Sequence, residues 1–494
     1  MVDLFAITHP EVKKATLALS DGVLEIDEVV RVVAHKRIVC RGRWGGLAVY
    51  AKIFIGKEAN RYALRDKTGV AALRQAGINT TDLLIATETH DGAHVLVYAA
   101  IKNAQNAEVV CKQLGKNARF RLMQKLVSTV AQHHQAGLIQ TDLYLKNFLV
   151  QYDSAQYAVA QNALVYTLDG DGIRPLFKLF QNRQKLHNLA TLFSKMDVLD
   201  DVWIEDLYQA YCNETGIAFS VLDSAKVWNL TQKIRQHVSS AYADKKVFRN
   251  CTDVKVTQNF RHYLAIASGF LVEERQLLSL DPLLEDPLHN IKNGHTCTIA
   301  MAHMANWQVV IKRYNIKNRW HGLSRAVRPS RAAISWANAH RLIISNIMTP
   351  KPLALVEARF GALRQRAYFV SEYIDAPDVA QFFAQTHAME IKKNVADEVA
   401  LMFYRLSLLK ISHGDCKASN IKIKDSKPVL LDLDAMQADA SLFERKHIKD
   451  LKRFMRNWAN DAETTAMLKQ AFVMAYDEAG DPWSLPLLVR AGIA

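Results

Sequence analysis

The sequence predicts an α+β protein in which one fold occurs twice. Apolar residues make up 50% of the 494 residues and charged residues 23%, which is ordinary globular composition. Glycine (20) and proline (11) are scarce, which favours helix over loop-dominated folds. A chain of this length is expected to form two or more domains. The same order of motifs appears in both halves, and this repeat predicts a tandem duplication.

The first half begins with an alternating, strand-like pattern around a glycine cluster. Residues 36–56 form this pattern and end in a strand that carries Lys52. Residues 57–77 favour a helix that stops at Gly77. A second helix is predicted by an apolar stripe at steps of four and ends at Gly137; the stripe consists of Leu122, Leu126 and Val130. Residues 138–150 then predict a strand, a polar loop and another strand.

The second half repeats this order. Residues 293–314 predict a strand pair that ends with Lys312, and a helix follows near 331–345. A further helix face is indicated by Val395, Val399, Met402, Leu406 and Leu409. We place the domains at 1–247 and 248–494, after the helical segment 225–246. The acidic, proline-bearing stretch 279–290 is expected to lead into the first strand of the second domain.

The most specific motif is an aspartate, an asparagine five residues later, and a second aspartate at the end of an apolar strand. Asp415, Asn420 and Asp432 form it in the second half. Between Asn420 and Asp432 the pattern predicts a two-strand hairpin, whose open end would bring these two residues together. Carboxylate and amide oxygens in that arrangement suit Mg²⁺, and Asp415 would face the same point.

The first half offers the same set as Asp142, Asn147 and Asp169, with a hairpin longer by ten residues. Phosphoryl transfer from ATP needs a positioning carboxylate, metal ligands and a lysine on the nucleotide phosphates. Lys52 and Lys312 supply the lysine from a strand that follows a turn, as in a kinase. Each element alone is a weak signal, but four in kinase order, present twice, indicate a kinase.

The stretches TDLYLKNFLV and HGDCKASN followed by LLDLD resemble the Kdo/heptose kinase family of the lipopolysaccharide inner core. The resemblance implies two protein-kinase-like bilobal domains that use ATP and Mg²⁺ to phosphorylate a sugar hydroxyl of a membrane-anchored glycolipid. It makes Asp142 and Asp415 the catalytic aspartates. It also implies a set of metal ligands, namely Asn147, Asp169, Asn420 and Asp432. Glu372 would lie at the hinge between lobes, where the nucleotide base binds.

Four features depart from the family pattern. The helix acid that pairs with the lysine is Asp66 in the first half, and Ser335 occupies its place in the second. The first half has QTD where the second has HGD. The glycine loop is better formed in the first half (Gly42, Gly45, Gly46) than in the second (Gly294). One copy could therefore be a pseudokinase, and the sequence does not identify which copy is active.

The 63 basic against 49 acidic residues give a net charge of +14, which suggests an anionic partner. The segment 311–331 carries seven Lys or Arg and no acid, so it could bind glycolipid phosphates or an anionic membrane surface. No apolar run is long enough to span a bilayer, and the N-terminus lacks a secretory pattern. Six unpaired cysteines indicate a reduced compartment. We therefore expect a cytoplasmic protein, peripheral at the inner membrane.

Two alternatives remain open from the residues. A soluble small-molecule kinase of the choline or aminoglycoside type would also carry HGD-x-x-x-x-N, and it would act without a membrane. A non-catalytic scaffold of two kinase-like domains in glycolipid assembly is the other. A protein kinase is disfavoured because no A-P-E segment follows Asp169 or Asp432. A nucleic-acid partner is not expected, because no recognisable binding module accompanies the charge.

Overall fold

The computed structural model describes residues 14–33, 35–152, 163–315, 328–477 and 485–494. It is a mixed helix and sheet protein, as predicted, and divides into two compact units. Unit 1 comprises Met1–Met196 and Trp203–Thr231, and unit 2 comprises Asp197–Val202 and Gln232–Ala494. The division falls inside helix α7 (Val221–Ala243). The domain boundary that the sequence analysis places after residue 247 stays a prediction.

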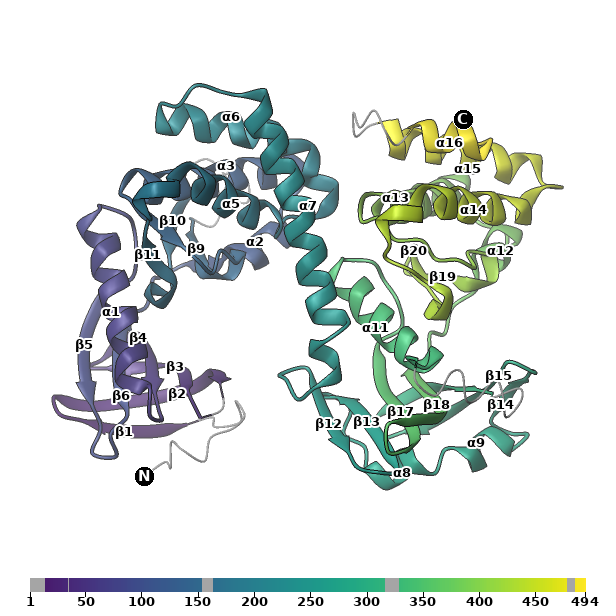
Figure 1. Ribbon diagram of the computed structural model, residues 1–494, viewed down its shortest axis with the longest axis horizontal. Helices are drawn as coiled ribbons and strands as arrows, with labels where there is room; N and C mark the ends of the chain where they lie inside the picture. The colour runs from purple at the N-terminus through teal and green to yellow at the C-terminus, as the bar shows by residue number, and fades with distance from the viewer. Residues whose placement is uncertain (1–13, 34, 153–162, 316–327, 478–484) are drawn as a thin grey trace. The chain divides into compact units, whose positions relative to one another are not determined.

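Unit 1 begins with a six-stranded antiparallel sheet in the order β1-β2-β3-β4-β6-β5. Its strands alternate buried and exposed residues, so one face carries an apolar core that includes Leu24, Ile38 and Val49. Helix α1 (Ala59–Gln75) follows the lysine-bearing strand β4 and lies beside the sheet (Figure 1). The strands are β1 (Ala15–Leu19), β2 (Gly22–Val33), β3 (Arg37–Trp44), β4 (Leu47–Phe54), β5 (Leu83–Glu88) and β6 (His94–Ala99).

The rest of unit 1 is mainly helical, with short strands that carry the polar loop. The predicted stripe Leu122, Leu126 and Val130 is buried on α3 (Lys116–Gln135), which confirms that helix. The other helices are α2 (Ala107–Gln113), α5 (Gln181–Phe193) and α6 (Ile204–Thr215). The short strands are β7 (Ala104–Asn106), β8 (Leu138–Gln140), β9 (Phe148–Gln151), β10 (Leu164–Thr167) and β11 (Ile173–Pro175).

Unit 2 contains a seven-stranded antiparallel sheet in the order β12-β13-β17-β18-β16-β15-β14. The expectation that its first strand follows residues 279–290 is wrong, because two strands already precede that stretch. Residues 263–267, the start of the apolar run 263–272, lie in one of them, β13, which is second in the sheet and pairs with β12 and β17. The strands are β12 (Val254–Gln258), β13 (His262–Ala267), β14 (Asn290–Asn293), β15 (Cys297–Met304), β16 (Trp307–Tyr314), β17 (Pro352–Phe360) and β18 (Leu363–Glu372).

The helices of unit 2 bury the predicted face of α13 (Met389–Leu408), with Val395, Val399 and Phe403 fully enclosed. Helix α11 (Arg331–Ile344) contacts the sheet, as α1 does in unit 1. The hairpin predicted after Asn420 is β19 (Ile421–Lys424) and β20 (Lys427–Leu430). The remaining helices are α8 (Glu274–Leu278), α9 (Asp281–Glu285), α12 (Val379–Ala384), α14 (Phe443–Met455), α15 (Ala462–Asp477) and α16 (Leu485–Ala491).

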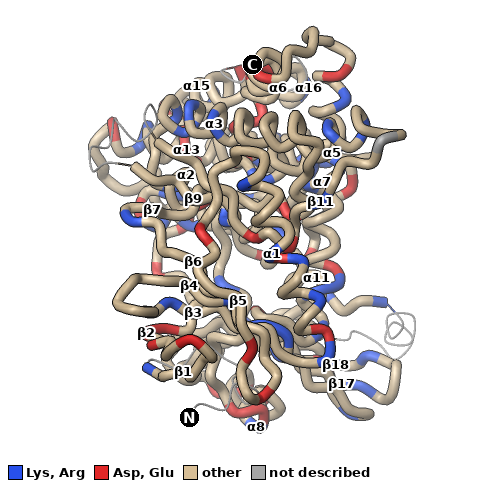
Figure 2. Tube along the Cα trace, turned by 90° about the vertical axis from the view of Figure 1, so that its left-hand side faces the viewer, with Lys and Arg blue, Asp and Glu red and all other residues tan. Residues whose placement is uncertain are grey.

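The order of elements is thus the same in both units: a strand pair ending in lysine, a helix, two strands, helices, and a loop that opens a hairpin. Lys and Arg are spread along the trace in the view of Figure 2. Residues 316–327 of the basic segment lie outside the described residues, so its predicted role in anion binding stays a prediction.

Candidate active site

The polar loop of each unit is closed by the side chain of its own asparagine. In unit 1, Asn147 Nδ2 donates to the carbonyl oxygen of Asp142 at 2.8 Å. In unit 2, Asn420 Nδ2 donates to the carbonyl oxygen of Asp415, also at 2.8 Å. Both asparagines are buried at the end of a 3-10 turn. The spacing of five residues is therefore the length that lets one side chain span the loop.

The hairpin after each loop brings the second aspartate back to the asparagine. Leu168 N donates to Asn147 O at 2.8 Å, and Leu431 N donates to Asn420 O at 2.8 Å. The next residue is Asp169 in one unit and Asp432 in the other. Both aspartates have left-handed backbones, with φ of 65° and 58°. Because this region is unfavourable for residues other than glycine, the same strain at the same point in both units marks a constrained site.

The residue two before the loop aspartate has the same task in both units despite a different identity. His413 Nε2 lies 2.8 Å from the carbonyl oxygen of Leu431, and Gln140 Nε2 donates to the carbonyl oxygen of Leu168 at 2.8 Å. Each bond ties the loop to the strand end that carries the second aspartate. The missing histidine of unit 1 is therefore replaced in function by Gln140.

Lys52 of unit 1 is held by two carboxylates. Its Nζ lies 2.5 Å from Asp66 on α1 and 3.0 Å from Asp169. Asp66 is fully buried and also accepts a hydrogen bond from Tyr98. Burial opposes the charge of Lys52, but Asp66 and Asp169 outweigh it and raise its pKa. Burial would likewise raise the pKa of Asp169, but Lys52 and Arg37 outweigh it and lower that pKa to about 2.

Lys312 of unit 2 is also held by two carboxylates, but neither is on the helix. Its Nζ pairs with Asp432 and lies 3.5 Å from Asp434, two residues further on. Ser335, which occupies the place of the helix acid, instead bonds Tyr314 at 2.8 Å. Asp434 is nearly buried and pairs with Arg331 of α11 at 2.6 Å. Burial opposes the charge of Lys312, yet Tyr314, Asp432 and Asp434 outweigh it and raise its pKa.

The two loop aspartates have different surroundings. Asp142 is exposed, and its carboxylate has no ion pair or hydrogen bond within the described part of the chain. Asp415 is partly buried and forms an ion pair with Arg453 of α14. Asp450, one turn before Arg453, accepts hydrogen bonds from the backbone N–H groups of His413 (2.7 Å) and Gly414 (3.0 Å). Helix α14 thus fixes both the backbone and the charge of the second loop.

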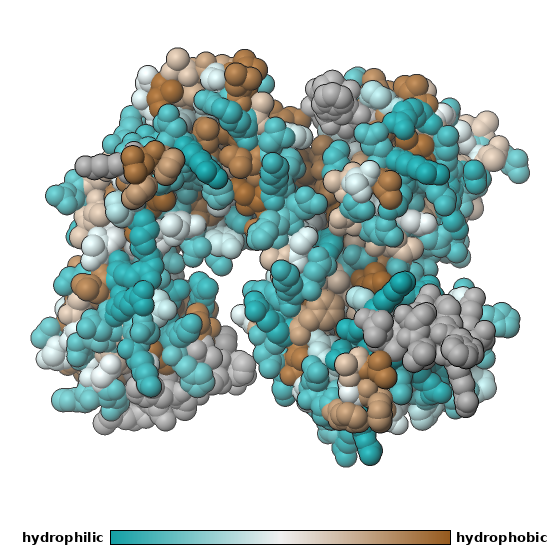
Figure 3. All heavy atoms as spheres, in the orientation of Figure 1, coloured by the Kyte–Doolittle hydropathy of each residue, from teal (hydrophilic) through white to brown (hydrophobic). Residues whose placement is uncertain are grey.

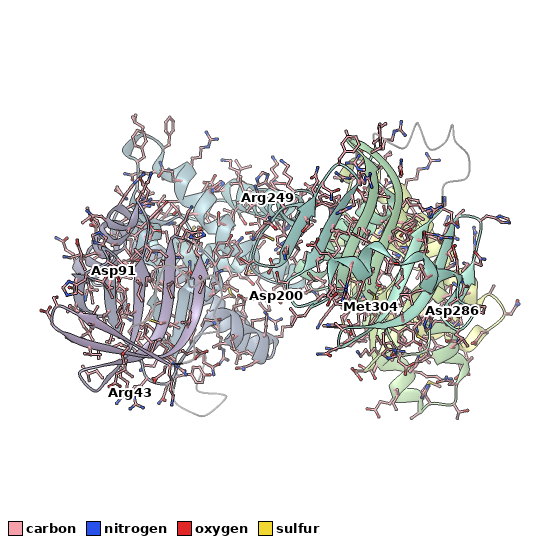
Figure 4. All side chains as sticks on the ribbon, turned by 90° about the horizontal axis from the view of Figure 1, so that it is seen from below. Arg43, Asp91, Asp200, Arg249, Asp286 and Met304 are labelled. Atoms are coloured by element: carbon pink, nitrogen blue, oxygen red, sulfur yellow. The ribbon has the colours of Figure 1, made fainter. Side chains whose placement is uncertain are left out.

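Gly45 and Gly46 form the two-residue turn between β3 and β4, with φ of +57° and +79°. Arg43 marks the strand end beside this turn in Figure 4. A Cβ at either glycine would meet nothing within 4 Å. In unit 2 the corresponding turn, Ala305–Asn306, lies between β15 and β16, just after the labelled Met304. Gly294 lies instead in the turn between β14 and β15, one hairpin earlier, where its N–H donates to the carbonyl oxygen of Cys297 at 3.0 Å. The glycines named for the two units thus fall in different turns, and their role at the phosphates stays a prediction.

Glu372 is the last residue of β18 in unit 2. Its N–H donates to the carbonyl oxygen of Lys351 at 3.0 Å, and its carboxylate accepts from Lys351 N at 3.3 Å. The side chain therefore braces the neighbouring strand. A role at a nucleotide hinge stays a prediction that rests on its backbone.

The donor set at each hairpin end fits a magnesium ion. Asn147 uses its Nδ2 for the loop, so its Oδ1, the ligand that Mg²⁺ prefers, is not engaged by that bond. The same holds for Asn420. Among the described residues, no group of three or more His, Cys, Asp or Glu side chains is arranged to hold a metal ion. One amide and one carboxylate, completed by phosphate oxygens, is the kind of set that magnesium takes with a nucleotide.

Sequence reasoning missed several residues that complete the lysine sites. Asp434 and Arg331 replace the helix acid in unit 2, while Tyr98 and Arg37 extend the network in unit 1. The sequence contained one signal for these partners: a second acid follows each candidate metal aspartate by two residues, namely Asp171 in unit 1 and Asp434 in unit 2. Its meaning depends on the fold, because Asp171 pairs with Arg65 at 3.2 Å and does not contact Lys52.

Comparison with known proteins agrees with this geometry. The model of the lipopolysaccharide kinase (Kdo/WaaP) family matches residues 59–211 and 285–476, which is more than half of the chain. A search of curated proteins finds no match. No helix in the described ranges has the length and apolar character needed to cross a membrane. The chain therefore belongs to the lipopolysaccharide kinase (Kdo/WaaP) family, in a two-copy form, and is a kinase of lipopolysaccharide biosynthesis.

Proposed function

We propose that the chain transfers the γ-phosphoryl group of ATP to a sugar hydroxyl, of heptose or Kdo, in the lipopolysaccharide inner core. The observation that carries this proposal is the repeated contact between a strand lysine and the aspartate at the hairpin end, Lys52 with Asp169 and Lys312 with Asp432. A lysine, an asparagine and two aspartates in this order are the components that phosphoryl transfer requires. Each unit would then be a protein-kinase-like bilobal domain.

Each residue has a task in this scheme. The lysine, charged at all physiological pH values because its pKa is raised, would bind the nucleotide phosphates. Asn147 with Asp169, and Asn420 with Asp432, would hold Mg²⁺, which when bound neutralises phosphate charge. Asp142 or Asp415 would accept a hydrogen bond from the acceptor hydroxyl and orient it. Gly45 and Gly46 would let backbone N–H groups approach the phosphates.

Unit 1 has the stronger claim to transfer. The carboxylate of Asp142 is exposed and available to a hydroxyl, whereas that of Asp415 is paired with Arg453. The two-glycine turn is also present only in the first of the two corresponding hairpins. Unit 2 would bind nucleotide with a slower transfer step.

The acceptor would be the glycolipid at the cytoplasmic face of the inner membrane, with the protein bound peripherally. The test is mass spectrometry of core oligosaccharide from cells that lack the chain, together with purified protein, MgATP and that core as acceptor. We expect a core that is lighter by one phosphate in the deletion and regains it in vitro. A core of unchanged mass in the deletion, with no transfer in vitro, would reject the proposal. Transfer to choline or an aminoglycoside, and not to the core, would instead favour a soluble small-molecule kinase.

A further inference from the structure

An exposed apolar turn follows strand β11 of unit 1, shortly after the candidate metal aspartate Asp169. It consists of residues 177–180, in which Phe177, Leu179 and Phe180 are 58%, 76% and 59% exposed. The rings of Phe177 and Phe180 stack at 6.5 Å. Single exposed apolar side chains are common, but three within four residues form a patch that needs an explanation. We call these residues the apolar turn.

The backbone of the apolar turn is anchored, although its side chains are not covered. Leu176 N donates to the carbonyl oxygen of Gly137 at 2.7 Å, at the start of the turn. Gln184 of α5 then accepts a hydrogen bond from Phe177 N at 3.1 Å. Brown spheres lie over the outer end of α5 in Figure 3, where this segment runs into the helix. The backbone of the turn is thus fixed by hydrogen bonds to Gly137 and Gln184 while its apolar side chains stay exposed.

Basic residues predominate in the sequence around the apolar turn, and one of them, Arg174, is paired with Asp171 at 4.0 Å. Residues 172–196 contain five Lys or Arg and no Asp or Glu: Arg174, Lys178, Arg183, Lys185 and Lys195. Lys195 also lies 4.5 Å from the ring of Tyr144, which is in the loop after Asp142. An apolar tip with a basic surround is the pattern of proteins that bind at the interface of an anionic bilayer. Because the basic surround complements anionic head groups and the exposed apolar side chains suit the acyl region beneath them, we take an anionic bilayer surface as the partner.

Unit 2 lacks this pattern at the corresponding place. The bridge between Ser412 and Gln437 corresponds to the pairing of β8 with β11, so residues 437–442 correspond to the segment that contains the apolar turn. That stretch reads QADASL and contains an acid, Asp439, whose side chain accepts from Ser441 N at 2.9 Å. Phe443 after it is buried, whereas Phe180 is exposed. The corresponding segments of the two units therefore differ: unit 1 has an apolar turn with basic neighbours, and unit 2 has a polar turn that contains an acid.

The position of the apolar turn relates it to the site. Strand β11 leads into it and pairs with β8, which leads into Asp142, and Thr141 N donates to Gly172 O at 2.9 Å. We propose that Phe177, Leu179 and Phe180 insert into the interface of an anionic phospholipid bilayer and bring the Asp142 loop to an acceptor held in that bilayer. This proposal rests on the proposed function for its acceptor, but the insertion itself can be tested without it.

The test compares full-length protein with the triple variant F177S/L179S/F180S in co-sedimentation with vesicles. Phosphatidylcholine vesicles with and without about 30% phosphatidylglycerol serve as probes, since anionic lipid should bind the basic surround. We expect the variant to partition to anionic vesicles about tenfold less than the wild type, because three apolar side chains lose their insertion. The matched control is V23S/V30S/L64S, three exposed apolar residues of unit 1 outside the turn, which should partition like the wild type.

Two measurements keep the outcomes distinct. Hydrogen exchange of peptides within 173–188 should slow on anionic vesicles, and the thermal shift with MgATP should be equal in both variants and the wild type, which shows that the fold is intact. Equal partition of the triple variant and the wild type would overturn the inference. So would a wild-type dimer, without vesicles, that the triple variant abolishes, since the turn would then bind a second copy.

Activity on two acceptors separates this inference from the proposed function. The triple variant should phosphorylate water-soluble, deacylated core as fast as the wild type, and vesicle-embedded glycolipid more slowly. Wild-type protein that phosphorylates neither acceptor would reject the proposed function while leaving the vesicle result to decide the insertion. Equal rates of both proteins on the embedded glycolipid would reject the link between insertion and transfer.

Discussion

The strand lysines of the two units, Lys52 and Lys312, are each paired with two carboxylates, but the second carboxylate comes from a different element in each unit. In unit 1 the second partner is Asp66 of helix α1, fully buried and fixed by Tyr98, and in unit 2 it is Asp434, which follows the hairpin and is fixed by Arg331. The serine at the helix position in unit 2 therefore does not leave Lys312 without a carboxylate. A missing motif residue shows only that the carboxylate is absent from one position. The fold is needed to show whether a carboxylate elsewhere in the chain pairs with the lysine instead.

The two units also differ in how the helix that follows the lysine strand, α1 or α11, packs against the end of the hairpin. Gly69 of α1 packs against Gly170 so closely that a Cβ at either residue would come within 2.2 Å of backbone oxygen. In unit 2, Asn338 of α11 instead donates to the carbonyl oxygens of Leu433 and Met436 at 2.9 and 3.0 Å. One unit brings its backbones together, and the other bridges the same gap with a side chain.

The largest expected difference between the units is catalytic. Asp142→Asn should lower the rate of phosphate transfer by about 10²–10⁴-fold, the range for loss of a positioned carboxylate. Asp415→Asn should lower it much less, because that carboxylate is already paired with Arg453. Transfer to core oligosaccharide, with the double variant as the baseline, measures both. A larger loss from Asp415→Asn would assign the main activity to unit 2.

The packing difference predicts unequal stability effects. Gly69→Ala should destabilise unit 1 by about 3 kcal/mol, because the new Cβ would overlap backbone atoms that cannot turn away. Asn338→Ala should cost unit 2 less, about 2 kcal/mol, through two carbonyl groups that lose a donor. Urea unfolding followed by peptide-resolved hydrogen exchange measures each unit by itself. Gly77→Ala, at a glycine with open space, tests only the strain of its positive φ.

The low pKa of Asp169 predicts a dependence of stability on acid. Its pKa is about 2 when folded and near 3.8 when unfolded, so its stabilisation is complete above about pH 4 and is lost as pH falls through 2. The difference corresponds to about 2 kcal/mol. The gap in unfolding free energy between wild type and Asp169→Asn should therefore narrow from pH 4 to pH 2. A gap that is constant over this range would contradict the ion pairs with Lys52 and Arg37.

The smallest effect concerns the replacement acid. Asp434→Asn should weaken MgATP binding by unit 2 about tenfold, because Lys312 loses the partner that remains when Asp432 turns to a metal ion. Asp171→Asn, at the matching position of unit 1, should leave binding by unit 1 unchanged, since Asp171 does not contact Lys52. Isothermal titration in the background of the other unit's lysine-to-methionine variant gives both values. Equal effects of the two substitutions would remove the distinction drawn between the units.

The sequence predicted the features that depend on local pattern. The stripes on α3 and α13, the lysine strands and the hairpin after Asn420 all follow from periodicity and turn residues. The pairing of Lys312 with Asp434 could not be predicted, because it depends on how a hairpin end meets a strand 122 residues earlier. The unit 2 turn was missed since Ala305 takes a positive φ where glycine is the expected residue. β12 and β13 were missed because an apolar run fits a buried strand or helix equally well.

The left-handed backbone at Asp169 and Asp432 bears on how the two copies have changed since they arose. A glycine at either position would relieve about 1 kcal/mol of strain, so a copy released from its chemical task would gain stability by discarding the acid. Neither copy has done so. We therefore propose that both units bind an ion, and that nucleotide occupancy of the unit with the slower transfer step is part of how the whole chain works.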